Sequence, residues 1–277
     1  MTEGCVFAID VFLWLWYSDM YMITGEYADM RMRKRANLDK RMERCADLLI
    51  ETPEELRGQW QETFPGHTRL YVELGCGKGR FTADTAETIP DTLYIAVEKV
   101  PDAMILAMEK IDRRGLENVR FIDADAKFLN TMFAEAELDR LYINFCDPWP
   151  KSRDAKLRLT SPAFLRIYAD VLKQGGEIHF KTDNTPLFDW SIGQLEAEGW
   201  QLSEVTHDLH ANGPVGIMTD YEAKFYEQGM KINRLVAAKT AATKTTAAGA
   251  VPRLRNASLT DARGYEESQE ANRRNNE

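Results

Sequence analysis

The sequence predicts an α/β fold in which a mainly parallel sheet carries helices on both of its faces. Short runs of β-branched and aromatic residues, each of strand length, alternate with segments of helical periodicity. Such alternation is typical of parallel strands that are joined by crossover helices. The 277 residues suffice for one large domain or for two smaller ones, and we expect one domain with loose ends.

Seven segments are expected to form the strands of this sheet. Five of them alternate with helices and make up its parallel part: residues 69–74, 92–97, 118–122, 140–145 and 177–180. The last two segments, residues 200–209 and 224–237, follow each other without a clear helix between them. We therefore expect an antiparallel pair that closes the sheet, with an antiparallel last strand.

Three helices are expected from their periodicity and from the residues at their ends. One begins near Arg80, after a glycine turn. A second spans residues 102–114, ends before Gly115 and carries four apolar residues on one face: Met104, Ile105, Met108 and Ile111. A third begins at Ser161 and Pro162, which supply an N-cap and a first-turn proline, and it ends before Gly175.

Charge and cysteine content limit the possible functions. The formal net charge of -9 argues against a nucleic-acid partner only at first sight, because residues 1–29 hold five acids and no Lys or Arg. Basic clusters are therefore possible in the rest of the chain. The four cysteines have no CxxC spacing, so we expect neither a zinc site nor a disulfide framework, and a reducing cytoplasm fits. No metal is expected.

Both ends of the chain are expected to lie outside the folded domain, which we place at residues 30–237. Residues 5–23 are apolar, but Asp10 and Asp19 interrupt them and no basic stretch precedes them, so neither a signal peptide nor a membrane span is predicted. Residues 1–29 are interpreted as an extension, or as the product of an upstream start codon, since the basic stretch from Met30 resembles a natural beginning. Residues 238–277 have almost no large apolar residues and are expected to be disordered.

A glycine turn follows the first expected strand and indicates a ligand that approaches the backbone closely. Gly75, Gly77 and Gly79 supply the turn, because glycine has no Cβ and reaches positive φ without strain. The dinucleotide fingerprint GxGxxG would need glycine where Arg80 stands, which disfavours a nicotinamide cofactor. Glu73, just before the turn, would repel a pyrophosphate and suits a ligand that carries a cation.

Acidic residues recur where the next two expected strands end. Glu98 is placed to accept both hydroxyls of a ribose, and Asp125, which is followed by Ala126, is placed to hold the amino group of an adenine. Together with Glu73, these acids lie at three successive strand ends beside one crevice. This pattern fits S-adenosylmethionine better than a phosphate-bearing cofactor.

The fourth expected strand leads into the stretch Asp147-Pro148-Trp149-Pro150. The prolines fix φ on either side of the tryptophan, and the ionised aspartate only accepts hydrogen bonds. Guanine offers a matching pair of donors, N1–H and N2–H, and binding through them would leave N7 free. A short basic run follows that suits phosphates, comprising Lys151, Arg153, Lys156 and Arg158.

At this point the chain resembles a known family. The stretch from Asp147 to Lys151, the glycine turn, the segment Lys181-Thr182-Asp183 and the late Thr219-Asp220-Tyr221-Glu222 are similar to those of bacterial tRNA (guanine-N7-)-methyltransferases. The resemblance runs from about residue 30 to residue 237. It implies a Rossmann-like class I methyltransferase fold and transfer of a methyl group from S-adenosyl-L-methionine to a guanine in the tRNA variable loop.

The resemblance also implies roles for individual residues. Asp147 would be the catalytic position, and the S-adenosylmethionine site would comprise Glu73, Gly75, Gly77, Glu98, Asp125, Ala126 and Asp147. The guanosine would be bound by Lys151, Asp183, Thr219, Asp220, Tyr221 and Glu222. RNA would be touched by Arg153, Asp154, Ala155, Lys156, Leu157 and Arg158. The family usually carries histidine where Asp154 stands and arginine where Leu157 stands, so weaker RNA affinity is expected at that loop.

The expected chemistry needs no general base, because guanine N7 carries a lone pair and no proton. Asp147 would hold the guanine and stabilise the migrating positive charge, while the basic residues between Arg31 and Arg44 and between Lys151 and Arg158 would bind tRNA. We expect no membrane and a monomer or a homodimer. The alternatives are a methyltransferase that acts on another RNA, a protein or a small molecule, and an RNA-binding relative without catalysis.

Overall fold

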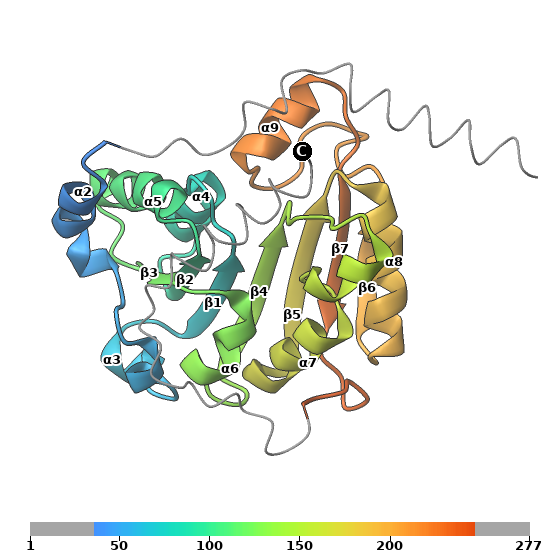
Figure 1. The fold of residues 1–277 in the computed structure, drawn as a ribbon, viewed down its shortest axis with the longest axis horizontal. Helices are drawn as coiled ribbons and strands as arrows, with labels where there is room; N and C mark the ends of the chain where they lie inside the picture. Colours follow the sequence, from blue (N-terminus) through green and yellow to red (C-terminus); the bar gives the residue numbers. More distant parts are fainter. Residues whose placement is uncertain (1–35, 247–277) are drawn as a thin grey trace, which may run out of the picture. The chain divides into compact units, whose positions relative to one another are not determined.

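A seven-stranded sheet forms the centre of residues 36–246, the part of the chain that the computed structural model describes (Figure 1). Its strand order is β3-β2-β1-β4-β5-β7-β6, and residues 37–246 belong to one compact unit. The expected extension at residues 1–29 and most of the expected tail, from residue 247 on, lie outside the described residues. Those two expectations stay predictions.

The strands agree with the predicted mainly parallel sheet and its antiparallel last strand. Strand β1 (Arg69–Leu74) runs parallel to β2 (Thr92–Glu98) and β4 (Leu138–Asn144). Strand β3 (Val119–Asp123) is parallel to β2, and β5 (Leu172–Thr182) is parallel to β4. Strand β7 (Asn233–Ala238) is antiparallel both to β5 and to β6 (Gln201–Thr206). Along the chain, β1 to β3 extend the sheet in one direction, and β4 and the later strands extend it in the other. The strand order therefore reverses between β1 and β4.

Helices cover both faces of the sheet, as expected. The α-helices of the described part are α2 (Leu38–Arg44), α3 (Trp60–Thr63), α4 (Arg80–Thr88), α5 (Pro101–Arg114), α6 (Leu129–Met132), α7 (Pro162–Val171), α8 (Thr185–Ala197) and α9 (Asp220–Glu227). Short 3-10 turns comprise Ala46–Leu48, Pro53–Leu56, Ala126–Phe128 and Ser152–Leu157. Between residues 36 and 246, no helix has the length and apolar character needed to cross a membrane.

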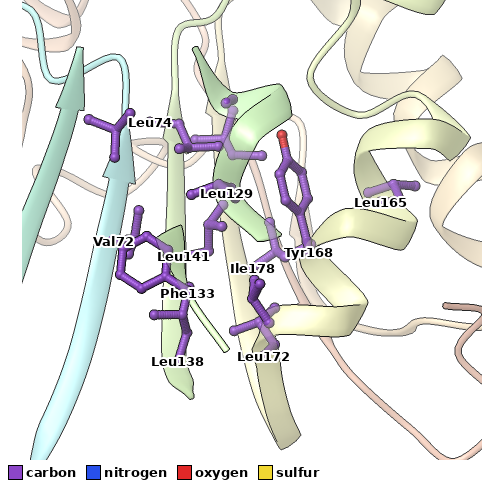
Figure 2. Close-up of a cluster of buried hydrophobic side chains, with 14 of the residues drawn as sticks. Val72, Leu74, Leu129, Phe133, Leu138, Leu141, Leu165, Tyr168, Leu172 and Ile178 are labelled. Carbon is purple, nitrogen blue, oxygen red and sulfur yellow. The ribbon is translucent and has the colours of Figure 1, made fainter. Parts of the chain in front are cut away.

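One face of the sheet is packed by α6, α7 and α8. Val72 and Leu141 point from the strands toward Phe133 and toward Tyr168 of α7 in a fully buried cluster (Figure 2). The opposite face is packed by α4 and α5, where Phe81, Met104 and Met108 cover β1 and β2. These two apolar layers hold the sheet rigid and so fix the position of every loop at its edge.

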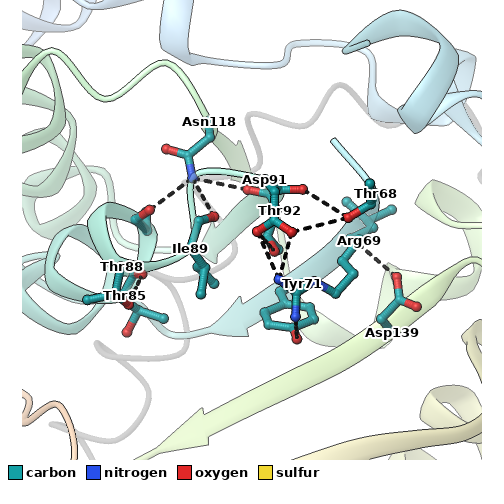
Figure 3. A network of polar contacts seen from close by, with 12 residues as sticks. Thr68, Arg69, Tyr71, Thr85, Thr88, Ile89, Asp91, Thr92, Asn118 and Asp139 are labelled. Atoms are coloured by element: carbon teal, nitrogen blue, oxygen red, sulfur yellow. Dashed lines mark hydrogen bonds and ion pairs between the residues drawn. The ribbon is translucent and has the colours of Figure 1, made fainter. Parts of the chain in front are cut away.

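A polar network fixes the end of the sheet at which β1 and β2 begin (Figure 3). Arg69 donates to both oxygens of Asp91, at 2.8 and 2.9 Å. The Asn118 side-chain amide contacts three backbone oxygens, those of Ala86, Ile89 and Thr92, within 3.3 Å. The end of α4 is therefore tied to the start of β2, at the edge opposite the strand ends that carry the acids.

The expected strand at residues 224–237 is wrong in its first part. Residues up to Glu227 belong to helix α9, and β7 begins only at Asn233. The helix forms because Thr219 and Glu222 make a capping box, in which each side chain bonds the backbone of the other residue. The T-x-x-E spacing in the sequence was the signal for this helix.

Residues 239–246, which the sequence assigns to the tail, make specific contacts with the domain. The Thr243 hydroxyl donates to the Gly199 carbonyl oxygen at 3.0 Å, and the Lys244 backbone donates to Glu198 at 2.9 Å. Thr246 in turn donates to Asp170. The ordered part of the domain therefore extends at least to residue 246, beyond the predicted boundary at 237.

Candidate active site

The predicted site residues gather at one edge of the sheet. The carboxyl ends of parallel strands meet at the same edge, and open α/β sheets bind ligands there, at the point where the strand order reverses. In this chain that point lies between β1 and β4. The ends of β1, β2, β3, β4 and β5 bring Glu73, Glu98, Asp125, Asp147 and Asp183 to this edge.

The glycine turn after β1 has the backbone conformation that its sequence predicts. Gly75, Gly77 and Gly79 all have positive φ, of 75°, 55° and 71°. A Cβ on Gly79 would lie 2.4 Å from the Ala107 Cβ, so this glycine lets α4 and α5 pack closely. A Cβ on Gly75 or Gly77 would meet no atom within 4 Å. The space over these two glycines is open, as a ligand that lies against the backbone requires.

Glu73 is buried beneath this turn, with 1% of its surface exposed. Its carboxylate accepts hydrogen bonds from Thr82 of α4 at 2.7 Å, from Tyr94 of β2 at 3.2 Å and from Asn144 of β4 at 3.2 Å. Burial raises the pKa of Glu73 above its usual value, although the three donors act in the opposite direction. Glu73 therefore joins three strands and a helix directly under the ligand space.

Glu98 organises the loop beyond β2. Its carboxylate accepts hydrogen bonds from the backbone N–H groups of Gly77, Lys99 and Val100, at 2.9 to 3.0 Å. Burial raises the pKa of Glu98. A carboxylate has about four acceptor positions, so one remains for a hydroxyl of a ligand. Glu98 thus fits one of the two predicted ribose hydroxyl contacts while it also fixes the glycine turn.

Asp125 and Ala126 lie at the next strand end. The Asp125 side chain accepts a hydrogen bond from the Lys127 backbone at 3.0 Å and so caps the 3-10 turn that begins at Ala126. Its side chain is 35% exposed. An open glycine turn followed by two carboxylates at successive strand ends fits a ligand with a ribose and an amino group. These residues are therefore suited to S-adenosylmethionine.

Asp147 lies exposed on a strained loop at the end of β4. Within residues 36–246, no side chain or backbone group forms a hydrogen bond or ion pair with its carboxylate. Phe145 and Trp149, on either side of it, have φ of 54° and 43°, in the left-handed region that favours glycine. Each such residue costs on the order of 1–3 kcal/mol, and strain of this kind gathers at functional sites.

Arg158 holds this loop in place. Its guanidinium donates to the carbonyl oxygens of Pro148 at 3.0 Å and Trp149 at 2.9 Å, and it lies 4.4 Å from the centre of the Trp190 ring. Arg158 is predicted to touch RNA, but its Nε and Nη2 atoms donate to the Asp147 loop. Arg153, in contrast, has a side chain that is 77% exposed, and Lys151 and Lys156 are exposed as well. The basic run therefore divides into an inward arginine and three outward cations.

The late motif Thr219 to Glu222 also divides into inward and outward residues. Glu222 is fully buried and accepts from Lys181 at 2.6 Å and from His210 at 3.1 Å, so it anchors α9 beside the end of β5 (Figure 1). Thr219 caps the helix. Tyr221 is 44% exposed and Asp220 is exposed, so these two are accessible to a substrate.

Asp183 follows the end of β5 and is half-buried. Burial raises its pKa above the usual value. Its neighbour Cys146, on the Asp147 loop, has a pKa raised to about 12 by burial and by the charge of Asp147, so the thiol stays protonated. Cysteine nucleophilic chemistry is therefore disfavoured at this edge.

Three residues of this edge were not identified from the sequence. Asn144 and Lys181 pair with Glu73 and Glu222, and His210 contacts Glu222 from a loop. For Lys181 a sequence signal was available, because it belongs to the Lys181-Thr182-Asp183 segment that is similar to the family.

Arg41, predicted to bind tRNA, instead binds both oxygens of Glu109 at 2.7 and 2.6 Å and ties α2 to α5. Lys40 and Arg44 of that predicted basic stretch are exposed, and its cations before residue 36 lie outside the described residues.

Comparison with known proteins agrees with this geometry. A family model described as "Putative methyltransferase" matches residues 67–235. A tRNA (guanine-N(7)-)-methyltransferase of Streptococcus suis is 40% identical over 209 residues, which cover 75% of this chain and 99% of that protein. The chain belongs to the tRNA (guanine-N7-)-methyltransferase family. The resemblance read from the motifs is thus confirmed.

Solved structures of lower identity support the fold of this family member. An antibiotic-related methyltransferase is 19% identical, with a TM-score of 0.51, and covers 66% of this chain and 93% of its own. The 16S rRNA methyltransferase KamB is 15% identical, with the same TM-score of 0.51, and covers 66% and 92%. The predicted class I methyltransferase fold is confirmed by the sheet order and by these similarities.

Proposed function

We propose that this protein transfers a methyl group from S-adenosyl-L-methionine to N7 of a guanine in the variable loop of tRNA. The observation that carries the proposal is Asp147, an unpaired carboxylate on a strained, arginine-braced loop at the same sheet edge as the glycine turn. The 40% identity to a protein named for this reaction supports the choice of substrate.

The cofactor would be held by the β1, β2 and β3 ends of the sheet. Glu98 accepts one ribose hydroxyl, Asp125 holds the adenine amino group, and Gly75 and Gly77 leave the space open. When bound, S-adenosylmethionine supplies a methyl group on a positively charged sulfur. Glu73, beneath the turn, ties α4 and β2 to β1 through Thr82 and Tyr94, and its carboxyl adds negative charge when it is ionised.

Asp147 would perform two tasks. Its carboxylate accepts the guanine N1–H and N2–H, which orients N7 toward the methyl group, and its charge stabilises the positive charge that develops on the purine. Guanine N7 carries a lone pair in the ring plane and no proton, so no residue has to remove one. Alignment of two reactants in this way contributes as much as about 7–11 kcal/mol in favourable systems. Electrostatic groups that are already in place add to this effect.

The exposed cations would bind the tRNA backbone. Lys151, Arg153 and Lys156 face solvent beside the Asp147 loop, and Tyr221 and Asp220 lie exposed on α9. A structured tRNA keeps its guanine engaged, and extracting a base costs a few kcal/mol. Contacts from these cations to phosphates offset that cost. Arg158 contributes indirectly, because it shapes the loop.

The test is transfer of a labelled methyl group to unmodified tRNA, with the product position read by chain cleavage at N7-methylguanine after reduction and aniline treatment. We expect one cleavage site in the variable loop for the wild type. Asp147→Ala should show no cleavage while it keeps the fold of the wild type, checked by thermal melting. Label at another atom, near-normal turnover by Asp147→Ala, or failure of the wild type to bind the cofactor would each refute the proposal.

A further inference from the structure

Helix α9 is held in place by one buried carboxylate, that of Glu222 in its first turn. Glu222 has no exposed surface, and both of its oxygens accept hydrogen bonds. Its Oε2 atom accepts from the Lys181 ammonium at 2.6 Å and from the backbone N–H of Thr219 at 3.2 Å. Its Oε1 atom accepts from the His210 imidazole at 3.1 Å. A carboxylate without access to water depends on such donors, so the position of α9 depends on these three groups.

The two ring nitrogens of His210 have different partners, and these partners assign its tautomer. The backbone N–H of Val215 donates to Nδ1 at 3.1 Å, so Nδ1 carries no proton. The other nitrogen of a neutral imidazole then carries it, and Nε2 is the atom that donates to Glu222. The His210 side chain is only 3% exposed, so water does not replace either partner. One uncharged ring therefore connects a loop with α9.

The loop that carries His210 joins β6 to α9. Residues 207–219, all of them described, contain no helix or strand, so side-chain contacts fix the path of this loop. Its beginning is held where the Leu209 backbone donates to the Ile232 carbonyl oxygen at 2.8 Å. Its end is held where Lys181 donates to the Ile217 carbonyl oxygen at 2.9 Å. His210 supplies the contacts between these two points, to the loop backbone and to the helix that follows it.

Helix α9 in turn packs against the loop that carries Asp147. The Phe225 ring of α9 lies with its centre 6.1 Å from that of Phe145, the residue with left-handed φ two positions before Asp147. The centre of the Tyr221 ring lies 6.3 Å from that of Phe225, and Tyr221 is 44% exposed at the active-site edge. A displacement of α9 would therefore move both the Asp147 loop and an exposed aromatic ring beside it.

We propose that His210 is a positioning residue for methyl transfer, which holds Glu222 through its Nε2–H and so fixes α9 against the Asp147 loop. This role rests on the proposed function, because it concerns the rate of that reaction. His210 is too deeply buried to touch tRNA, so it acts through Glu222 and α9. Its loss should disturb the alignment of the guanine, whereas the exposed cations that bind phosphates lie on another loop.

Two substitutions in the full chain separate the two contacts of the imidazole. Asparagine in His210→Asn can place its oxygen where Nδ1 lies and accept from Val215, but it has no atom at the position of Nε2. Glutamine in His210→Gln can place its amide N–H at the position of Nε2 and donate to Glu222, but it loses the acceptor for Val215. The first variant removes the contact that fixes α9, and the second retains it.

His179→Asn is the matched control. His179 is another largely buried imidazole beside a carboxylate, with its Nε2 atom 2.9 Å from Glu177. Its ring also lies edge-on to that of Tyr142, and neither of these contacts involves α9. Loss of this imidazole should lower the melting temperature without slowing methyl transfer. The control therefore measures the effect of removing a buried imidazole as such.

Two measurements are made at a temperature at which thermal melting shows every variant to be folded. The first is hydrogen exchange of the backbone amides of residues 220–227, which should be about tenfold faster in His210→Asn and near the wild-type rate in His210→Gln. The second is single-turnover methyl transfer to tRNA at saturating cofactor. The maximal rate should be about tenfold lower in His210→Asn, whereas the tRNA concentration for half-maximal rate should change by about twofold or less. His210→Gln and His179→Asn should stay within about threefold of the wild-type rate.

A slow His210→Asn with a rescued His210→Gln supports the role of His210. A wild-type rate or wild-type exchange in His210→Asn, an equal loss in His179→Asn, or an effect on the half-maximal tRNA concentration alone overturns it. If asparagine prevents folding, His210→Gln decides, because a folded glutamine variant that is about tenfold slower also overturns the role. The exchange measurement needs no turnover. A wild type that fails to methylate guanine N7 therefore refutes the proposed function, while exchange still tests whether His210 fixes α9.

Discussion

The two halves of the active-site edge are built in opposite ways. At the ends of β1 and β2, Glu73 and Glu98 each accept three hydrogen bonds from the protein itself. At the end of β4, Asp147 accepts none from the described residues, and the backbone around it is strained. The carboxylates of the first half already have hydrogen-bond partners within the protein. The Asp147 carboxylate of the second half has none among the described residues, so it is available to the N–H groups of the substrate.

This difference follows from what each half has to do. A cofactor used in every turnover gains from a loop that is already ordered, because no entropy is lost in ordering it on binding. A catalytic group gains from being free of protein partners, since interactions that exist only with the reacting base lower the barrier. Arg158 reconciles the two needs on the β4 side, because it fixes the loop through carbonyl oxygens and leaves the Asp147 carboxylate unpaired.

Asp147→Asn gives the largest expected effect. Asparagine keeps the size but loses the charge, and its amide group opposes the donors of guanine. We expect the single-turnover rate of methyl transfer to fall by about 10²–10³, the range found when a preorganised electrostatic group is removed. Cofactor affinity, measured by calorimetry, should change far less than the rate, although the family resemblance also counts Asp147 in the cofactor site. A comparable loss of cofactor affinity would show that the two halves are not separate.

Glu73→Ala should have the largest effect on stability. The change leaves the hydroxyls of Thr82 and Tyr94 and the amide of Asn144 without their acceptor, all inside the sheet. We expect the free energy of unfolding, measured by urea denaturation, to fall by about 3 kcal/mol or more. A loss below about 1 kcal/mol would mean that Glu73 is not a structural centre of the cofactor half.

Glu73→Gln should separate the hydrogen bonds of this residue from its charge. The folded-state pKa of Glu73 is raised above 4.5, so the folded protein binds this proton more tightly than the unfolded chain does. The stability gained from the bound proton is fully present below pH 4.5 and is lost as the pH rises through the folded pKa. The neutral glutamine does not titrate. The stability of Glu73→Gln relative to the wild type should therefore increase from pH 4 to pH 8. A constant difference over this range would contradict the prediction.

Arg158→Ala should act on the rate rather than on RNA binding. Loss of its guanidinium releases the Pro148 and Trp149 carbonyl oxygens and lets the strained loop relax. We expect about a tenfold lower kcat, since small displacements of a catalytic group lower rates to this extent or more. The salt slope of tRNA binding should remain that of the wild type. A slope lower by about one unit would place Arg158 on the RNA instead.

The sequence predicted most of the strands and placed the acids at the correct edge, because both depend on local patterns. Strand ends are visible as apolar runs that stop at an acid, as at Glu98 and Asp123. Side-chain direction is not local. Arg153 and Arg158 look alike in the sequence, and only the position of the Trp190 ring and the loop carbonyls directs Arg158 inward. Lys181 and Glu222, 41 residues apart, likewise meet only through the packing of α9.

Arg153→Ala should have the smallest effect and the opposite character to Arg158→Ala. The Arg153 side chain is 77% exposed, and its ion pair with Asp154 is 3.7 Å long, so its loss should not alter stability measurably. We expect tRNA affinity to fall a few-fold with a salt slope lower by about one unit or less, and kcat at saturating tRNA to be retained. Two arginines five residues apart would then divide the work, one on the loop and one on the phosphates. Equal effects of both variants on kcat and on the slope would remove the distinction between an inward and an outward arginine.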